Sequence, residues 1–137
     1  MADAPPDPIP LHAHLDLEFL EAVADADHAA VRMPVAPNAF GFTANLHGGA
    51  VATLVDCACA LAVVRSSGFD PEVESLVTVD MHVRYLGTPR TGAVIGRAKV
   101  VKAGSSIVVV ECKVVDDDEH LVAVADFSMM RVPTRGA

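Results

Sequence analysis

Two features of the sequence combine residue types with a spacing suited to chemistry: the His-Gly-Gly triplet at 47–49 and Asp56. Asp56 is the single charged residue between Gly48 and Val64, in a segment that is otherwise nearly all apolar. A carboxylate in apolar surroundings is costly unless it is hydrogen-bonded or functional. Asp56 is therefore a candidate nucleophile or general base. The alternative is a carboxylate that faces solvent or caps a neighbouring turn.

The triplet His47, Gly48 and Gly49 stands where a helix is expected to begin. The first amide groups of a helix lack partners within the helix, and the helix dipole adds positive potential at that end. Glycine also lets a ligand approach the backbone closely. These properties favour an oxyanion hole or an anion site. An ordinary junction between a loop and a helix is the alternative.

The spacing between these two features constrains how they work together. Asp56 follows Gly48 by eight positions, which is roughly 12 Å along an α-helix. Both groups cannot act on one carbonyl within one subunit at that separation. If two copies of the chain pair with these helices antiparallel, Asp56 of one copy approaches Gly48 of the other. The spacing therefore predicts an active site shared across a homodimer.

One long helix over residues 48–66 is expected to position both features. The segment contains no proline and is rich in Ala and Leu, which favour helix, and it is too long for an ordinary strand. Because it is apolar nearly all round, this helix must be buried on most sides.

Strands are expected on both sides of this helix. Four strand-like runs with hairpin-like spacing follow it and indicate antiparallel pairing, at 76–86, 93–102, 107–115 and 120–132. Before the helix, residues 15–19 alternate like a strand, with a short helix over 11–23 as the alternative, and 29–35 form another strand. The predicted class is α+β, an antiparallel sheet of about six strands wrapped around one long central helix. One helix covers a single face of such a sheet, so an oligomer is expected.

Charged residues on the strand over 76–86 are expected to form a solvated or interfacial cluster, and those in the later acidic turn to be solvated. Alternation over 76–86 predicts two faces, one with Val77, Val79, Met81, Val83 and Tyr85, the other with Thr78, Asp80, His82 and Arg84. Turns are expected at 25–27 and at 116–119, the latter as a solvent-facing acidic turn.

The composition is that of a single folded domain. The chain has 137 residues, of which 52% are apolar, so it can bury a core. A proline-rich mobile arm over 1–10 is expected to precede one domain over 11–137. The net charge of −8 and the 4% aromatic content argue against nucleic-acid binding. Neither a signal peptide nor a membrane span is recognised, and three cysteines fit no disulfide framework or zinc motif, so a cytoplasmic protein without metal or cofactor is expected.

The segment LHGGAVATLVD (46–56) resembles the signature of hotdog-fold acyl-CoA thioesterases of the phenylacetate-degradation type. The similarity continues through LVTVDMHVRYLGTPRTG (76–92) and VVKAGSSIVVVECKVVDDDEHLVAVADFSMM (100–130), and it covers roughly residues 15–132. The resemblance implies hydrolysis of an acyl-CoA to a carboxylic acid and free CoA. It also implies a homo-oligomer, at least a dimer and usually a tetramer built from two dimers.

The resemblance implies a role for each candidate site residue. Asp56 would attack the thioester carbonyl or activate water, the Gly48 N–H would stabilise the oxyanion, His47 would orient the substrate carbonyl or the loop, and Thr78 would help to place the water. A second group would contact the rest of the substrate, CoA included, and comprises Gly49, Lys102, Gly104, Ser105 and Ser106. Arg84 joins this group from its charge alone.

One position departs from the family pattern. Relatives commonly carry Asn six residues before the His, where this chain has Gly41. NAFG (38–41) resembles the start of that motif, with FTA inserted before NLHGG. Either Asn38 reaches the site over a longer loop, or Asn45 substitutes for it, or the role is absent. The altered loop keeps a non-catalytic acyl-CoA-binding protein of the same fold as the alternative function.

Overall fold

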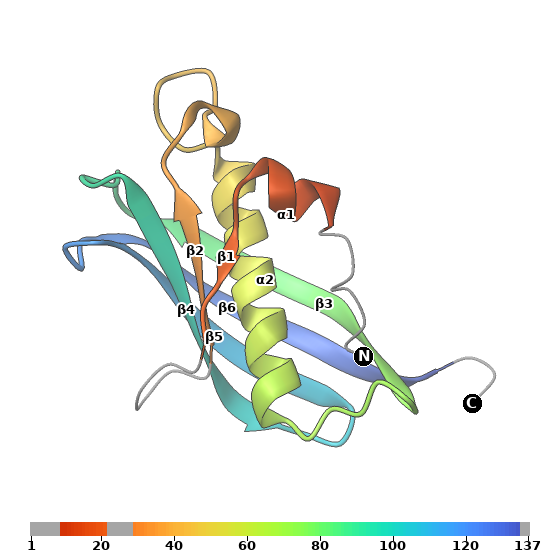
Figure 1. Cartoon of the computed structure of the whole chain (residues 1–137). Helices are drawn as coiled ribbons and strands as arrows, with labels where there is room; N and C mark the ends of the chain where they lie inside the picture. Colours follow the sequence, from red (N-terminus) through yellow and green to blue (C-terminus); the bar gives the residue numbers. More distant parts are fainter. Residues whose placement is uncertain (1–8, 22–28, 135–137) are drawn as a thin grey trace.

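Six strands and one long helix make up most of the residues that the computed structural model describes, 9–21 and 29–134 (Figure 1). Residues 1–8 of the predicted arm and the turn predicted at 25–27 lie outside these ranges. In chain order the elements are α1 (Pro10–His14), β1 (Glu18–Phe19), β2 (Ala29–Pro34), the short 3-10 helix η1 (Pro37–Ala39), α2 (Gly48–Ser66), β3 (Glu74–Tyr85), β4 (Ala93–Ala103), β5 (Ile107–Asp116) and β6 (Leu121–Pro133).

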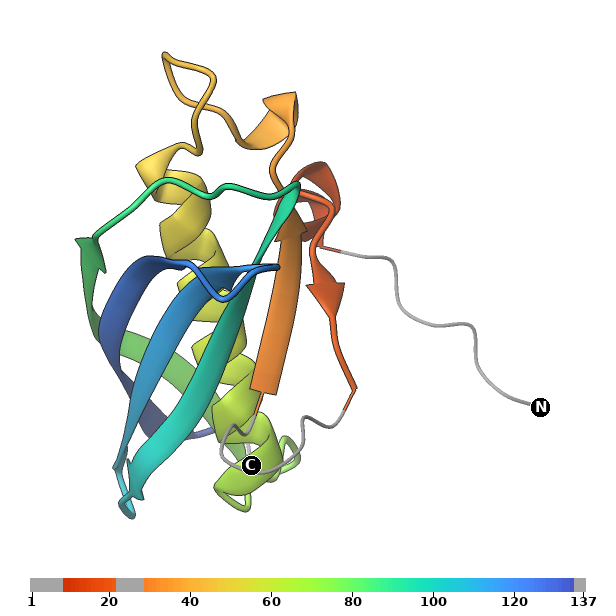
Figure 2. The same ribbon diagram turned by 90° about the vertical axis from the view of Figure 1, so that its left-hand side faces the viewer.

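The strands form one antiparallel sheet in the order β1-β2-β4-β5-β6-β3. Tight turns join β4, β5 and β6, while the connection over 86–92 carries the chain from β3 to β4 (Figure 2). The sheet curls around α2, as expected for a hotdog fold, so the predicted fold class is confirmed (Figure 1). β1 and β3 are the two edges of the sheet.

The central helix α2 packs into the hollow of the sheet and forms the core with it. Leu54, Val55, Ala58 and Cys59 are completely buried. The helix packs tightly over Gly96, where an added Cβ would lie 3.2 Å from Leu54 Cγ. By length and composition α2 could also cross a membrane, but half of the segment is buried inside the protein, as in the core helix of a globular fold.

The segment before β2 combines both predicted alternatives. A helix of one turn, α1, ends at His14, and the two-residue strand β1 then pairs with β2 at Glu18 and Phe19. The strand is shorter than predicted because α1 and its C-cap at Leu15 take up the preceding residues.

The two faces predicted for β3 hold from Asp80 to Tyr85 but are wrong for the residues before Val79, because the strand contains a bulge. Its pairing with β6 shifts between Thr78 and Asp80, which leaves Val79 as the extra residue. Thr78 and Tyr85 both bond to α2, although they are an odd number of positions apart and would face opposite sides of a regular strand. The bulge therefore turns Thr78 towards the helix, away from the charged face on which alternation had placed it.

Asp116 corrects the prediction of a solvated acidic turn. Its side chain is 1% exposed, and its carboxylate accepts the amides of Arg90 (2.9 Å), Asp118 (2.9 Å) and His120 (3.0 Å). Burial alone would raise the pKa of Asp116, but the amide bonds from Arg90, His120 and Asp118 outweigh it and hold the pKa below its ordinary value. Asp116 therefore ties the turn after β5 to the crossing connection before β4.

Replacing Asp116 by Asn is expected to lower the melting temperature at pH 7. The side-chain nitrogen of Asn would replace one carboxylate oxygen, and it cannot accept a hydrogen bond from the backbone N–H of Arg90 or of Asp118. The folded state lowers the pKa of Asp116, so its stabilisation is present above the unfolded pKa and is lost as pH falls through the folded pKa. The difference in melting temperature between wild type and Asp116→Asn should therefore shrink below about pH 4. Asp118→Asn, at an exposed position of the same turn, is the matched control. Equal melting temperatures for wild type and Asp116→Asn at pH 7 would contradict this role.

Candidate active site

His47, the residue before α2, satisfies most of the amides of the first helical turn. Its Nδ1 accepts a hydrogen bond from the Gly49 N–H at 2.8 Å. Its carbonyl oxygen accepts the Ala50 and Val51 amides at 2.9 and 3.2 Å. His47 is thus the N-cap of the helix, and it bonds amides that lack partners within the helix.

Gly48 carries the amide of this first turn that has no hydrogen-bond acceptor among residues 9–21 and 29–134. The helix dipole places positive potential at the same point. An open N–H at a helix N-terminus can donate to an anion or to the oxygen of a polarised carbonyl. Gly48 therefore offers the donor that the sequence indicates, whereas the Gly49 N–H is already bonded to His47.

Tyr85, at the end of β3, contacts the same turn and was not singled out from the sequence. Its hydroxyl donates to the Gly48 carbonyl oxygen at 2.7 Å. Its ring lies beside Gly48, with ring atoms 3.5–3.7 Å from the place that a Cβ would occupy. The chain places Tyr85 and Gly48 37 positions apart, so only the pairing of β3 reveals this contact.

Asp56 lies on α2 at the side that faces β3. The Thr78 hydroxyl donates to its Oδ1 at 3.0 Å, and Asp56 remains partly exposed. A carboxylate that accepts a hydroxyl on one oxygen keeps its other oxygen available for attack or for proton transfer. The structure thus brings together Asp56 and Thr78, two of the predicted site residues.

The predicted site residues form two separate groups within one protomer. His47, Gly48 and Gly49 lie at the start of α2, while Asp56 lies two turns further along the helix, where Thr78 of β3 bonds to it. No hydrogen bond joins the two groups in the described part of the chain. Within one protomer each group therefore has hydrogen-bond partners of its own, and the two groups are separated along α2.

The loop before α2 uses the side chains of both candidate asparagines. Asn38 Nδ2 donates to the His14 carbonyl at 3.2 Å, and Asn45 Nδ2 donates to Thr43 Oγ1 at 3.3 Å. The loop projects beyond the start of α2 (Figure 1). The Phe42 side chain in this loop is fully exposed. Neither asparagine bonds to Asp56 in the described residues.

Comparison with known families assigns the chain to one of them. The family model described as the thioesterase superfamily matches residues 43–123, more than half of the sequence. The chain belongs to the thioesterase superfamily. The matched range contains the start of α2 and Asp56, and β3 with Thr78 and Tyr85.

Individual relatives of this superfamily member agree in fold. A protein of Halobacterium salinarum described as a candidate esterase is 44% identical over 71 residues, which are 52% of this chain and 46% of that protein. The chain thus spans about half the length of this curated relative. A thioesterase structure from Haemophilus influenzae is 22% identical, covers 93% of this chain and 87% of its own, and has a TM-score of 0.80. A conserved protein of Pseudomonas aeruginosa is 30% identical, with 90% and 94% covered and a TM-score of 0.77.

The residues predicted to contact the CoA part of the substrate, Lys102 and the turn over 104–106, lie away from the start of α2. Lys102 is the penultimate residue of β4. The turn of Gly104, Ser105 and Ser106 follows the strand and is closed by the Gly104 N–H, which donates to the Ile107 carbonyl at 2.9 Å. Strand register places this turn at the end of the sheet away from Tyr85. The structure therefore does not bring the turn together with Gly48 in one protomer.

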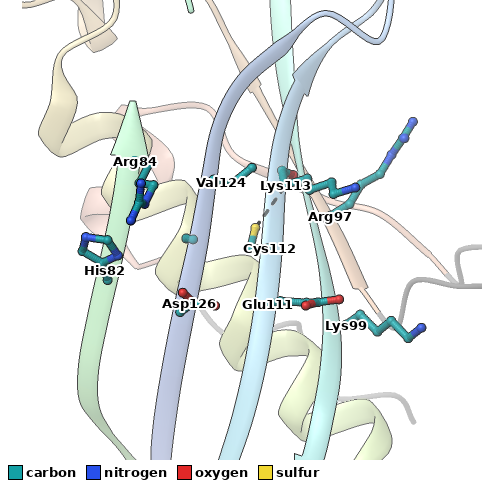
Figure 3. A pocket seen from close by; sticks show the side chains of 10 residues that line it. His82, Arg84, Arg97, Lys99, Glu111, Cys112, Lys113, Val124 and Asp126 are labelled. Carbon is teal, nitrogen blue, oxygen red and sulfur yellow. Dashed lines mark hydrogen bonds between the residues drawn. The ribbon is translucent and has the colours of Figure 1, made fainter. Parts of the chain in front are cut away.

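Arg84 lines a hollow on the outer face of the sheet, with α2 on the opposite side (Figure 3). Its strand neighbours Val83 and Tyr85 pack towards the core and α2, so Arg84 faces away from them. The charged side chains around the hollow come from β3, β4, β5 and β6, and they are His82, Arg84, Arg97, Lys99, Glu111, Lys113 and Asp126. The sheet separates this charged face from Asp56 of the same protomer. Among the described residues, no three His, Cys, Asp or Glu side chains converge as metal ligands.

Cys57 follows Asp56 directly and forms a Cys-His contact that could be mistaken for a catalytic pair. Its Sγ lies 3.3 Å from His12 Nε2, and the residue is 7% exposed. Burial, together with the negative charge of Asp56, raises the pKa of Cys57 to about 11. The thiol is therefore protonated at neutral pH and is a poor nucleophile.

Replacing Cys57 by Ser is expected to leave any hydrolytic activity within about threefold of wild type, because the protonated thiol takes no part in attack. Steady-state rates for the two proteins at pH 7 and pH 8 are the measurement. A loss as large as that of an Asp56 variant would show that Cys57 participates in the reaction.

Proposed function

We propose that this protein is an acyl-CoA thioesterase that converts a CoA thioester and water to a carboxylic acid and free CoA. The observation that carries the proposal is the pairing of an open Gly48 amide with the Thr78-bound Asp56 carboxylate on one helix of a thioesterase-superfamily domain. The LHGGAVATLVD motif at 46–56 supports placement near the phenylacetate-degradation type.

In the proposed reaction the thioester oxygen accepts the Gly48 N–H, which stabilises the negative charge that develops on it. Asp56 attacks the carbonyl carbon or takes a proton from the water that attacks it. Thr78, bonded to Asp56 Oδ1, leaves Oδ2 for this step and holds the carboxylate in place. In the general-base route, collapse of the tetrahedral intermediate breaks the C–S bond, gives the carboxylic acid, and lets protonated Asp56 return its proton to the CoA sulfur. In the nucleophilic route, C–S cleavage leaves an anhydride on Asp56, which water hydrolyses to the carboxylic acid and free Asp56 while the CoA thiolate takes up a proton.

The proposed site is shared between two copies of the chain. Ala52, Asp56, Ala60 and Val64 recur every four residues along α2 and are all at least partly exposed, so they form a face that the sheet leaves open. β3 beside this face is an edge strand, and its Val77, Val79 and Met81 are 50%, 51% and 36% exposed. Such an edge invites pairing with another chain. An antiparallel partner there would carry its own Gly48 towards Asp56.

Several finer assignments belong to the same proposal. Lys102, Ser105 and Ser106 are proposed as contacts for the phosphates of CoA, which suit cationic and hydroxyl donors. Arg84 lies near the other end of the sheet, on its outer face, so it would join them only from a different protomer. The assembly is proposed to be a tetramer of two dimers, and the location is proposed to be the cytoplasm.

A non-catalytic acyl-CoA-binding protein is the second candidate, and one observation favours it. The Asn38 amide donates to the His14 carbonyl of α1 and the Asn45 amide to Thr43 in the loop, so neither bonds to Asp56 in the protomer. Such a protein would bind the ester through the Gly48 amide without hydrolysing it.

Thiol release from a panel of short-chain, medium-chain and aryl acyl-CoAs tests the proposal. A thioesterase turns over at least one member of the panel and thereby identifies its preferred acyl group. Saturable binding of CoA esters by the folded oligomer, with no turnover of any of them, would replace the thioesterase with the binding protein.

A further inference from the structure

The peptide group between Gly48 and Gly49 is held by side chains at both of its polar ends. The Gly49 N–H donates to His47 Nδ1 at 2.8 Å, and the Gly48 carbonyl accepts the Tyr85 hydroxyl at 2.7 Å. We propose that Tyr85 is a positioning residue that, with His47, clamps this peptide so that the adjacent open Gly48 N–H keeps one orientation. The inference rests on the proposed thioesterase function and assigns the Tyr85 hydroxyl a place in it.

The two glycines explain why a clamp is needed at this point. Glycine has more accessible backbone conformations than any other residue, and the first turn of a helix lacks part of its hydrogen-bond ladder. The peptide before Gly48 is held at its carbonyl by the Ala50 and Val51 amides. The peptide after Gly48 is held by His47 and Tyr85. Gly48 therefore lies between two fixed peptide planes, and its N–H is pre-organised.

A role in orientation fits Tyr85 better than a role in stability. The side chain is 54% exposed, so it contributes little to the core. The carbonyl that it bonds belongs to the first residue of α2 and is also a helix acceptor, so the phenol adds a second bond. A donor held in place before the reaction needs no reorganisation in the transition state.

Tyr85→Phe keeps the ring beside Gly48 and removes only the hydroxyl. This variant is expected to lower kcat by about fivefold at unchanged KM, the effect of one ordinary hydrogen bond. Leu86→Ala is the matched control, because Leu86 is 56% exposed and adjacent, and its side chain has no bond to α2. In a Gly48→Pro background, which lacks the donor, Tyr85→Phe should have no further effect. An unchanged kcat, or the same fivefold loss in both backgrounds, would overturn the clamp.

Amide hydrogen exchange gives a readout that does not depend on turnover. Loss of the Tyr85 hydroxyl should speed exchange of the Gly49 amide by about fivefold, because the peptide that it shares with Gly48 opens more often. If wild-type protein hydrolyses no thioester, the proposed function is wrong, and the Gly49 exchange rate still decides the clamp. Unchanged exchange in Tyr85→Phe would exclude it.

Discussion

Replacing Asp56 by Asn is expected to lower kcat/KM for thioester hydrolysis by at least about a hundredfold, or roughly 2.7 kcal/mol of transition-state stabilisation. Asn keeps the volume of Asp and can still accept the Thr78 hydroxyl, but it has neither the charge for attack nor the basicity to deprotonate water. The fold should be unaffected, because Asp56 is partly exposed and its one side-chain hydrogen bond among the described residues is to Thr78.

The control for this variant is Asp126→Asn, which removes the same charge on the outer face of the sheet. Thiol release by wild type and both variants, with melting temperatures measured alongside, separates loss of chemistry from loss of fold. Turnover by Asp56→Asn within about tenfold of wild type would remove Asp56 from the reaction and direct attention to other water-activating groups.

The helix and most strand boundaries could be predicted because their signals are local. α2 begins at Gly48 and ends at Ser66, where an apolar segment without proline meets Ser67 and Gly68. β4 and β5 differ from their predicted ranges by one residue each, since the turn at Gly104 sets the hairpin between them. Local composition and turn residues are sufficient for these features.

The contacts that build the site could not be predicted in this way, because they join distant positions. Thr78 lies 22 positions after Asp56, and its approach depends on a bulge that simple alternation does not reveal. Asp116 is a surface residue by local pattern, and only the crossing connection that carries Arg90 buries it. The role of Asp56 was inferred from its isolation in an apolar helix, which is a local signal, whereas its partners required the sheet register.

Gly48→Pro is expected to lower kcat/KM by about a hundredfold, the usual cost of losing one oxyanion donor. Proline removes the N–H and is otherwise suited to this position. Gly48 is the first residue of α2, where proline is favoured, and His47 before it is extended (φ −63°, ψ 133°), as a residue preceding proline prefers. Gly48→Ala keeps the N–H and is the matched control, since its Cβ would lie 3.5 Å from the Tyr85 ring, an ordinary contact. A similar loss in both variants would indicate a steric effect in place of a lost donor.

Mixing the two inactive proteins tests whether the site is shared. In a heterodimer of Asp56→Asn and Gly48→Pro chains, a shared arrangement leaves one site with an intact Asp56 from one chain and an intact Gly48 from the other. Random pairing of equal amounts makes half of the dimers mixed, so about a quarter of the wild-type activity should return. A site contained within one chain would give no recovery, because every chain then lacks one of its two groups. Recovery would therefore establish that the helices meet antiparallel, as the separation of Gly48 and Asp56 along α2 requires.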